Sequence, residues 1–415
     1  MLRITTAQSF DSGVARLQTR QSDLAQAQER LTSGKRVAKA SDDPTAAARA
    51  ERALATSARA QANQRALETS RSAMALTEGM LGDAGELMQQ ARETLVAAGN
   101  ATYSDAERAS LAERLTGIRQ QLLAIANRGD GDGGFLFGGQ GASEPPFVDA
   151  AGGVSFRGTA GEVLVASGEP LPRAVDGMAA WLASPSGNGL FETRNVAPAP
   201  NASGAWIDAG RVTDPQAFFA ATSPPVVANP AALTYRVEFS TTAGVTTVSV
   251  LKDGAATAVA GAAYVSGSAI EIDGMAFNVS GAPAAGDAFE LTLATPTLGV
   301  FDTFDRVIAE LKTPLRTGAA VTQGVQRGLA DLDGSMGALL SLRSRVGELL
   351  NRTDSIEGRI AAQALAAQTE RSNAEDLDMV QAISDFQNQQ TGYDAALKTY
   401  ATVQRMSLFQ YLNGG

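Results

Sequence analysis

Three short runs of carboxylates are the residues of this chain whose types and spacing could best support chemistry. They are Asp42-Asp43, Asp130-Gly131-Asp132 and the group Glu375, Asp376 and Asp378. Paired carboxylates can share a proton in acid–base catalysis or supply the oxygen ligands of a divalent cation. Each run lies next to an expected helix end or a glycine-rich turn, where acidic side chains accept backbone amides and complement the helix dipole. We therefore predict no catalytic, cofactor-binding or metal site.

The stretch around Asp130 carries two further motifs, and neither predicts a binding site. Arg128-Gly129-Asp130 has the sequence of integrin-binding tripeptides, but a glycine-rich turn after a helix explains it more simply. A calcium loop counted from Asp130 needs Gly at its sixth position and Glu at its twelfth, and these are Phe135 and Gly141. We expect a structural turn here.

The absence of two residue types excludes most common active sites. The 415 residues contain no His and no Cys. Ser-His-Asp triads, Cys-His nucleophiles, zinc clusters, HExxH peptidase sites and disulfides therefore cannot form. Only an enzyme based on carboxylates or Lys passes this test, so the composition favours a structural or binding protein.

Charge and hydropathy exclude two classes of partner. The formal net charge is −10, whereas nucleic-acid binding needs clustered Lys and Arg. No run of about 18 apolar residues exists that could span a membrane, and residues 1–6 lack the basic and apolar regions of a Sec signal peptide. We expect no nucleic-acid or membrane partner, and either a cytoplasmic location or export without a cleaved signal.

Proline divides the chain into three parts. Thirteen of the 15 prolines lie in residues 135–296, which also hold 6 basic and 14 acidic residues. Because proline disrupts helix interiors, we predict an α+β multidomain fold with long helices on both sides of a mainly β insertion. The expected domains are a terminal coiled coil (1–44 with 372–415), a helical rod (45–134 with 297–371) and a β-rich middle domain (135–296).

Apolar residues at alternating spacings of three and four mark helical seams at both ends of the chain. The first seam is Phe10, Val14, Leu17, Gln21, Leu24, Gln28 and Leu31, and the last is Met379, Ile383, Phe386, Gln390, Tyr393, Leu397 and Tyr400. Burying these seams against each other predicts a long antiparallel bundle formed by both termini. Because glutamines weaken that pairing, we predict that the seams also contact neighbouring subunits.

The residues that follow the first seam have the types that end and restart helices. Gly34 suits a helix C-cap, Asp43 suits the next N-cap, and Pro44 suits the first helical position. Further helices are expected from residue 45 to about 98, from about 104 to 127, and from about 300 onward.

The middle region shows strand patterns with a period of two. We predict strands at 235–239, 245–251, 269–272, 276–279 and 289–293, with turns at Asp253-Gly254 and Asp273-Gly274. Residues 184–203 are rich in Pro, Gly and Asn. That composition predicts an exposed loop or linker, which should accept an insertion near Ser186.

Two stretches of the sequence resemble the flagellin superfamily. Residues 31–44, Leu-Thr-Ser-Gly-Lys-Arg-Val-Ala-Lys-Ala-Ser-Asp-Asp-Pro, are similar to the superfamily signature L-S-S-G-x-R-I-x-x-A-x-D-D, and they include Gly34, Arg36, Asp42 and Asp43. Residues 377–412 look like the C-terminal helix of hook-associated proteins. Pro44, the segment 134–139 and the ending Ser407-Leu408-Phe409 resemble the hook–filament junction family more than flagellin itself.

The resemblance implies a structural role in the bacterial flagellum. A member of this family is exported through the flagellar type III system without a cleaved signal, is served by an export chaperone, and is extracellular. It self-associates into a ring-like zone between hook-associated protein 1 and the flagellin filament, with terminal helices inside and the β domain facing outward. The expected assembly interface is Phe10, Val14, Leu17, Leu24, Leu31, Met379, Ile383, Phe386, Tyr393, Leu397, Tyr400 and Leu408.

Two other functions stay open at the level of the sequence. The chain could be a flagellin that builds the filament itself, or, in a different class, a coiled-coil surface adhesin whose acidic middle region binds a ligand. An adhesin normally shows a secretion signal or a membrane anchor, and neither is recognisable here.

Overall fold

The chain forms two compact units, which we describe separately. The computed structural model describes residues 6–100, 102–161, 163–164, 172–196, 204–223 and 232–412, without the side chains of residues 6–10, 163–164 and 403–412. Unit 1 consists of Met1–Arg65 with Ser355–Gly415, and unit 2 is Ala66–Asp354. The division into three domains at the predicted boundaries stays a prediction.

The long helices agree with the helices predicted from apolar spacing. They are α1 (Thr6–Ser33), α2 (Pro44–Ala98), α3 (Asp105–Ala126), α6 (Val300–Lys312), α7 (Gly318–Glu375) and α8 (Met379–Leu412). α3 starts with a capping box, in which the Ser104 hydroxyl accepts the Glu107 N–H and the Glu107 carboxylate accepts the Ser104 N–H. Two short helices, α4 (Met178–Leu182) and α5 (Pro215–Thr222), were not predicted.

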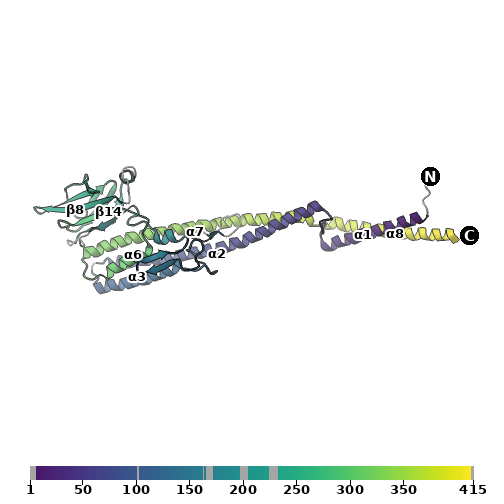
Figure 1. Cartoon of the computed structure of the whole chain (residues 1–415), viewed down its shortest axis with the longest axis horizontal. Helices are drawn as coiled ribbons and strands as arrows, with labels where there is room; N and C mark the ends of the chain where they lie inside the picture. Colours follow the sequence, from purple (N-terminus) through teal and green to yellow (C-terminus); the bar gives the residue numbers. More distant parts are fainter. Residues whose placement is uncertain are drawn as a thin grey trace. The chain divides into compact units, whose positions relative to one another are not determined.

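The core of unit 2 is a helical rod built from α2, α3, α6 and α7, which lie alongside one another in Figure 1. Apolar residues from the start of the proline-rich region also pack into this core. They come from α4 and from the hairpin of β1 (Phe147–Ala150) and β2 (Gly153–Phe156). The Trp181 ring stacks on Phe301 of α6 with centroids 5.9 Å apart. The first part of the proline-rich region therefore belongs to the rod core.

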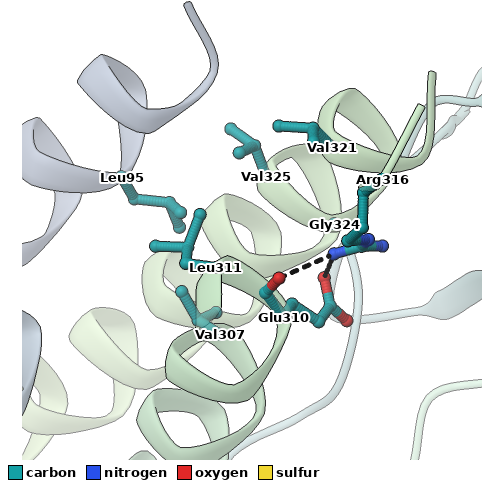
Figure 2. A pocket seen from close by; sticks show the side chains of 8 residues that line it. All are labelled: Leu95, Val307, Glu310, Leu311, Arg316, Val321, Gly324 and Val325. Carbon is teal, nitrogen blue, oxygen red and sulfur yellow. Dashed lines mark hydrogen bonds and ion pairs between the residues drawn. The ribbon is translucent and has the colours of Figure 1, made fainter. Parts of the chain in front are cut away.

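One small cavity lies inside the rod, between α2, α6 and α7 (Figure 2). Its volume is about 10 Å³, and its apolar walls are Leu95, Val307, Leu311, Val321 and Val325. An ion pair between Arg316 and Glu310, 3.2 Å apart, lies at its edge. A space of this size holds at most one water molecule, so it is a packing gap and not a ligand site.

The second core of unit 2 is a lobe of antiparallel sheets, which we call the β lobe (residues 191–293). One sheet has the order β10-β9-β8-β14-β5, with β11 also paired to β9, and the other has the order β12-β13-β6, with β7 also paired to β13. The strands are β5 (Phe191–Asn195), β6 (Trp206–Ile207), β7 (Arg211–Val212), β8 (Thr234–Thr242), β9 (Val245–Lys252), β10 (Ala255–Ala256), β11 (Ala262–Ala263), β12 (Ala269–Ile272), β13 (Met275–Ser280) and β14 (Ala288–Leu293). A further pair, β3 (Val163–Leu164) with β4 (Pro172–Ala174), lies outside the lobe.

All five predicted strands are present, and both predicted turns join neighbouring strands. Asp253-Gly254 connects β9 to β10, and Asp273-Gly274 connects β12 to β13. In each pair both residues have positive φ, from 46° to 82°, as a two-residue hairpin turn requires. The Tyr235 hydroxyl and the Lys252 ammonium both donate to Asp273, which ties the two sheets together.

The predicted exposed linker at residues 184–203 is wrong for its first thirteen residues. Ser184 and Ser186 are buried, Phe191 is fully buried, and β5 forms the edge of the larger sheet. A Pro-, Gly- and Asn-rich composition marks irregular backbone, but it does not decide whether tertiary contacts bury that backbone. Residues 197–203 lie outside the described part of the chain.

Candidate functional site

The terminal helices α1 and α8 form an antiparallel pair within unit 1 (Figure 1). Gly13 of α1 faces Tyr400, and Gly392 of α8 faces Arg20. A Cβ atom at Gly392 would lie 2.6 Å from Nη1 of Arg20, so the glycine leaves room for that side chain between the helices. The predicted pairing of the two terminal seams is therefore present in a single chain.

The pair covers its own apolar seams only in part. Val14, Leu17, Leu24, Leu31, Phe386, Tyr393 and Tyr400 are half-buried. Met379, Ile383 and Leu397 are 46%, 45% and 41% exposed. None of the seam side chains that the structure describes is fully buried, and the side chains of Phe10 and Leu408 lie outside the described residues. This surface keeps apolar area available for another helix.

The three glutamines predicted within the seams, Gln21, Gln28 and Gln390, are all exposed. They therefore leave no buried amide unsatisfied in the isolated pair. Two exposed apolar residues were not predicted. They are Val380, which is 83% exposed beside Met379, and Leu365 of α7, which is 66% exposed. Both positions fall outside the regular three–four spacing, so only their exposure reveals them.

Backbone hydrogen bonds join the loop after α1 to the end of α7. The N–H groups of Arg36 and Val37 donate to the Glu375 carbonyl at 2.7 and 3.4 Å, and the Leu377 N–H donates to the Gly34 carbonyl at 3.0 Å. Gly34 has a φ of +67°, the left-handed conformation that ends many helices. The chain thus turns out of α1 and contacts the α7–α8 connection at the same point.

The carboxylates of Asp42 and Asp43 both accept hydrogen bonds from backbone N–H groups, which gives each a structural role. Asp43 Oδ1 accepts the N–H groups of Thr45 and Ala46 at 3.1 and 3.0 Å, so it caps α2 directly before Pro44. The Ala46 N–H, the Thr45 hydroxyl and the Arg36 guanidinium lower the pKa of Asp43 to about 2. Asp42 Oδ2 accepts the N–H groups of Lys39 and Ala38, which lowers the pKa of that carboxyl.

The carboxylates before the last helix also have structural partners. Asp378 Oδ1 accepts the N–H groups of Val380 and Gln381 and so caps α8. Glu375 pairs with Lys35 at 2.9 Å and with Arg371 at 3.4 Å, and the bond from Lys35 is the largest cause that lowers its pKa. Within the described residues, no group of three or more acidic side chains has the arrangement of a metal site.

The Asp130 run forms a closed turn. Asp130 Oδ1 accepts the N–H groups of Asp132 and Gly134, each at 2.8 Å, and Arg173 lies near both carboxylates. The Asp130 side chain is only 6% exposed. The tripeptide Arg128-Gly129-Asp130 therefore presents no free carboxylate to a receptor.

Two grooves run along the helices of unit 1. One, of about 350 Å³, lies between α1 and α8 and is lined by charged and amide side chains, among them Asp23, Arg30, Gln381 and Asp385. The other, of about 530 Å³, lies between α2 and α7, with Ala53 and Ala367 on its floor. Both grooves lie between neighbouring helices, where another helix could pack.

No helix in the described ranges combines the length and the hydropathy needed to cross a membrane.

Two family models match the two helical ends of the chain. The model described as the bacterial flagellin N-terminal helical region matches residues 4–142, and the model of the bacterial flagellin C-terminal helical region matches residues 329–412. Together these stretches span more than half of the chain and include α1, α3, α8 and most of α7.

Similarity to individual proteins extends over the whole chain. Flagellar hook-associated protein 3 of Salmonella typhimurium is 26% identical over 418 residues, with 99% of each chain covered. The structure of flagellar hook-associated protein 3 from Legionella pneumophila aligns with a TM-score of 0.70 at 26% identity, covering 77% of this chain and 97% of that one.

A second Legionella pneumophila structure, that of the flagellar junction protein FlgL, aligns with a TM-score of 0.63 at 28% identity and covers 70% of this chain and 94% of that one. The helical ends, the α+β organisation with a β-rich middle region, and the full-length similarity agree with one another. The chain belongs to the flagellin superfamily and, within it, to the family of flagellar hook-associated protein 3.

Proposed function

We propose that this chain is a structural subunit of the bacterial flagellum that forms the junction between hook and filament, with no catalytic role. The observation that carries the proposal is the half-covered seam of the α1–α8 pair, in a chain whose relatives along its whole length are flagellar hook-associated proteins. Such a seam holds one chain together only weakly and offers its remaining apolar area to neighbouring subunits.

Burial of the exposed seam residues against a neighbouring subunit would provide free energy for assembly. Complete burial of a Leu, Ile or Met side chain contributes roughly 1.5–3 kcal/mol. Three seam residues are more than two-fifths exposed in the single chain: Met379, Ile383 and Leu397. Burial of that exposed area by a neighbouring subunit would add a corresponding share of this free energy to assembly. The proposed contacts are helix on helix, between the seams of one subunit and those of the next.

The proposed partners follow from a position at the junction. The chain associates with components of the hook on one side and of the filament on the other. In finer detail, we propose that it self-associates into a ring-like zone, with hook-associated protein 1 below and flagellin above. We also propose that it reaches the extracellular flagellum through the flagellar type III system without a cleaved signal, served by an export chaperone.

Two competing functions are less well supported. A flagellin or an adhesin could share the helical ends, but the similarity to hook-associated protein 3 also includes the middle region, since it covers 99% of the chain. The tripeptide that most suggests an adhesin lies in a turn where Asp130 is occupied by backbone amides.

Deletion of the gene followed by electron microscopy tests the junction role. We expect hooks without filaments, with flagellin released into the medium. Filaments of normal length in the deletion strain would show that the junction role is wrong.

Point variants then test the proposed surface. We expect Ile383→Asp and Leu24→Asp to be exported normally and to abolish junction formation, because a charge is placed in the seam. Ser384→Asp is the matched control, since Ser384 is the exposed polar neighbour of Ile383 on the same helix. Equal motility of Ile383→Asp and Ser384→Asp strains would rule out this seam as an assembly contact.

A further inference from the structure

Three polar residues of α7 face the β lobe from one side of the helix. Gln323, Arg327 and Asp331 are spaced four residues apart, which places them in one row along the helix. Gln323 Oε1 accepts the backbone N–H of Ile207 at 2.7 Å, and Arg327 lies 3.5 Å from Glu192. Gln323 is 7% exposed, so its contact with the lobe is buried.

Asp331 is the most buried member of this row. Its residue is 1% exposed, and its Oδ1 accepts the N–H of Gly187 at 2.9 Å while its Oδ2 contacts Arg306 of α6. Gly187 has a φ of +61°, and a Cβ atom there would lie 2.4 Å from the Phe191 carbonyl oxygen. The turn before β5 therefore requires glycine to present its N–H to Asp331.

The chain passes between rod and β lobe through two segments, 184–187 and 295–298, which we call the neck. Ser184 and Leu298 exchange backbone hydrogen bonds of 2.9 and 3.0 Å, and the Ser186 N–H donates to the Thr295 carbonyl at 3.4 Å. On α7, Gly334 lets the Pro185 carbonyl approach, since a Cβ atom there would lie 2.9 Å from that oxygen.

The cores on the two sides of the neck are separate. The rod core includes Trp181 before the neck and Val300 after it, and the lobe core includes Phe191 and Leu291. The two clusters have no residue in common. The contacts described above between α7 and the neck and lobe are two hydrogen bonds and one ion pair. The hydrogen bonds are directional and so can fix one orientation.

We propose that Gln323, Arg327 and Asp331 form a polar latch that fixes the orientation of the β lobe on α7, and that the lobe otherwise turns about the neck. The latch binds mainly backbone N–H groups, that of Ile207 in the lobe and that of Gly187 in the neck from which the lobe extends. It therefore depends on the backbone conformation of the neck and of β6, and not on the lobe's apolar side chains. Loss of Asp331 leaves the Gly187 N–H and the Arg306 guanidinium without this carboxylate, while both cores keep all their residues.

Tryptophan fluorescence can follow the two cores separately, because the chain has two tryptophans and one lies on each side of the neck. Trp181 is in the rod core and Trp206 is in β6 of the lobe. In a Trp206→Phe background the emission reports the rod, and in a Trp181→Phe background it reports the lobe. We expect the two urea midpoints to lie close together in the parent and to separate in Asp331→Ala, with the lobe unfolding first.

Asp333→Ala is the matched control. Asp333 lies two residues after Asp331, on a different face of the same helix, and pairs with Arg92 at 2.9 Å. It should leave the separation of the two midpoints unchanged. Asp331→Asn keeps an oxygen for the Gly187 N–H but loses the charge, so its separation should lie between those of the parent and Asp331→Ala. An unchanged separation in Asp331→Ala contradicts the coupling that the latch requires.

Lobe orientation can be measured directly, because the chain has no native cysteine. Spin labels at Val265→Cys in the lobe and Leu340→Cys on α7, which are 62% and 50% exposed in the parent, give a lobe-to-rod distance distribution. We expect a narrow distribution in the parent and in Asp333→Ala, and a broad one in Asp331→Ala. A distribution that stays narrow in a folded Asp331→Ala protein would show that Asp331 does not orient the lobe, and the three-residue latch would be refuted.

Discussion

The Arg36 guanidinium donates a hydrogen bond of 2.9 Å from Nη2 to the carbonyl oxygen of Ala374, although the two residues are 338 positions apart. Nη1 of the same group lies 3.3 Å from Asp43 Oδ2. One side chain therefore connects the loop after α1, the N-cap of α2 and the last turn of α7. The signature Gly34, Arg36, Asp42 and Asp43 serves local structure at this crossing of the chain.

We predict that Arg36→Ala loosens the connection between α1 and α8. The amide of Leu377, which donates to Gly34, should exchange with solvent several-fold faster, because the guanidinium no longer joins the two segments. Hydrogen exchange with mass spectrometry measures this. Lys39→Ala is the control, since Lys39 is more exposed and its distance to Glu29 is 3.8 Å; similar exchange in the two variants would contradict the prediction.

We predict that the cap at Asp43 is sensitive to acid. Its folded-state pKa of about 2 is below its ordinary value of 3.8, so its contribution to stability is fully present above about pH 4 and is lost as the pH falls through about 2. The difference in melting temperature between the parent and Asp43→Ala should be constant near neutral pH and shrink in acid. Asp43→Asn is the control, because its amide oxygen still caps the helix but does not titrate. A parent-to-Ala difference that does not fall in acid would count against the ionised cap.

We predict that Arg119→Ala destabilises unit 2 by about 1.5–3 kcal/mol, the usual contribution of hydrogen bonds to charged groups. Arg119 is 8% exposed, lies 2.6 Å from Asp149 and 2.7 Å from Asp305, and covers the Phe301 ring. The two carboxylates raise the pKa of the guanidinium. Urea unfolding measures the loss, and Arg114→Ala, an exposed Arg on the same helix, should change stability far less. Equal stability of the two variants would mean that Arg119 does not join α3 to α6.

We predict opposite outcomes for a short peptide inserted at two places in the β lobe region. Insertion between Ala243 and Gly244, at the exposed tip of the β8–β9 hairpin, should leave the fold and motility intact. Insertion at Ser186 should disturb the neck, because Ser186 is 6% exposed and its neighbour Gly187 donates to Asp331. Circular dichroism and motility assays compare them, and a fully tolerated Ser186 insertion would contradict the neck contacts.

We predict that the terminal helices of the soluble monomer exchange quickly. A single amphipathic helix is marginal in water, and the seams of α1 and α8 are only half covered by each other. Residues 11–33 and 379–402 should exchange faster than residues 105–126 of α3, whose Leu115 and Leu122 are buried. Strong protection of both termini in a verified monomer would show that the pair is complete without neighbouring subunits.

The helices and the main strands could be predicted because their patterns are local. Gly34 and Asp43 mark helix ends by their own chemistry, and Asp253-Gly254 marks a hairpin turn. The neck could not be predicted, because the buried N–H of Gly187 has its partner at Asp331, 144 positions later in the chain. The same holds for Trp181, whose place in the rod core depends in part on Phe301, which stacks on it from far along the chain. The exposure of the terminal seams also depends on tertiary packing.

The neck has a consequence for how members of this family can diverge. Because Ser184 and Leu298 are hydrogen-bonded to each other, the chain leaves the rod and returns to it at nearly one point. Everything between them is an insertion whose removal would leave a gap short enough for a tight turn to close. The lobe can therefore grow, shrink or be exchanged during evolution while the helices keep their lengths and register. On α7, the row Gln323, Arg327 and Asp331 is the part that must change along with the lobe.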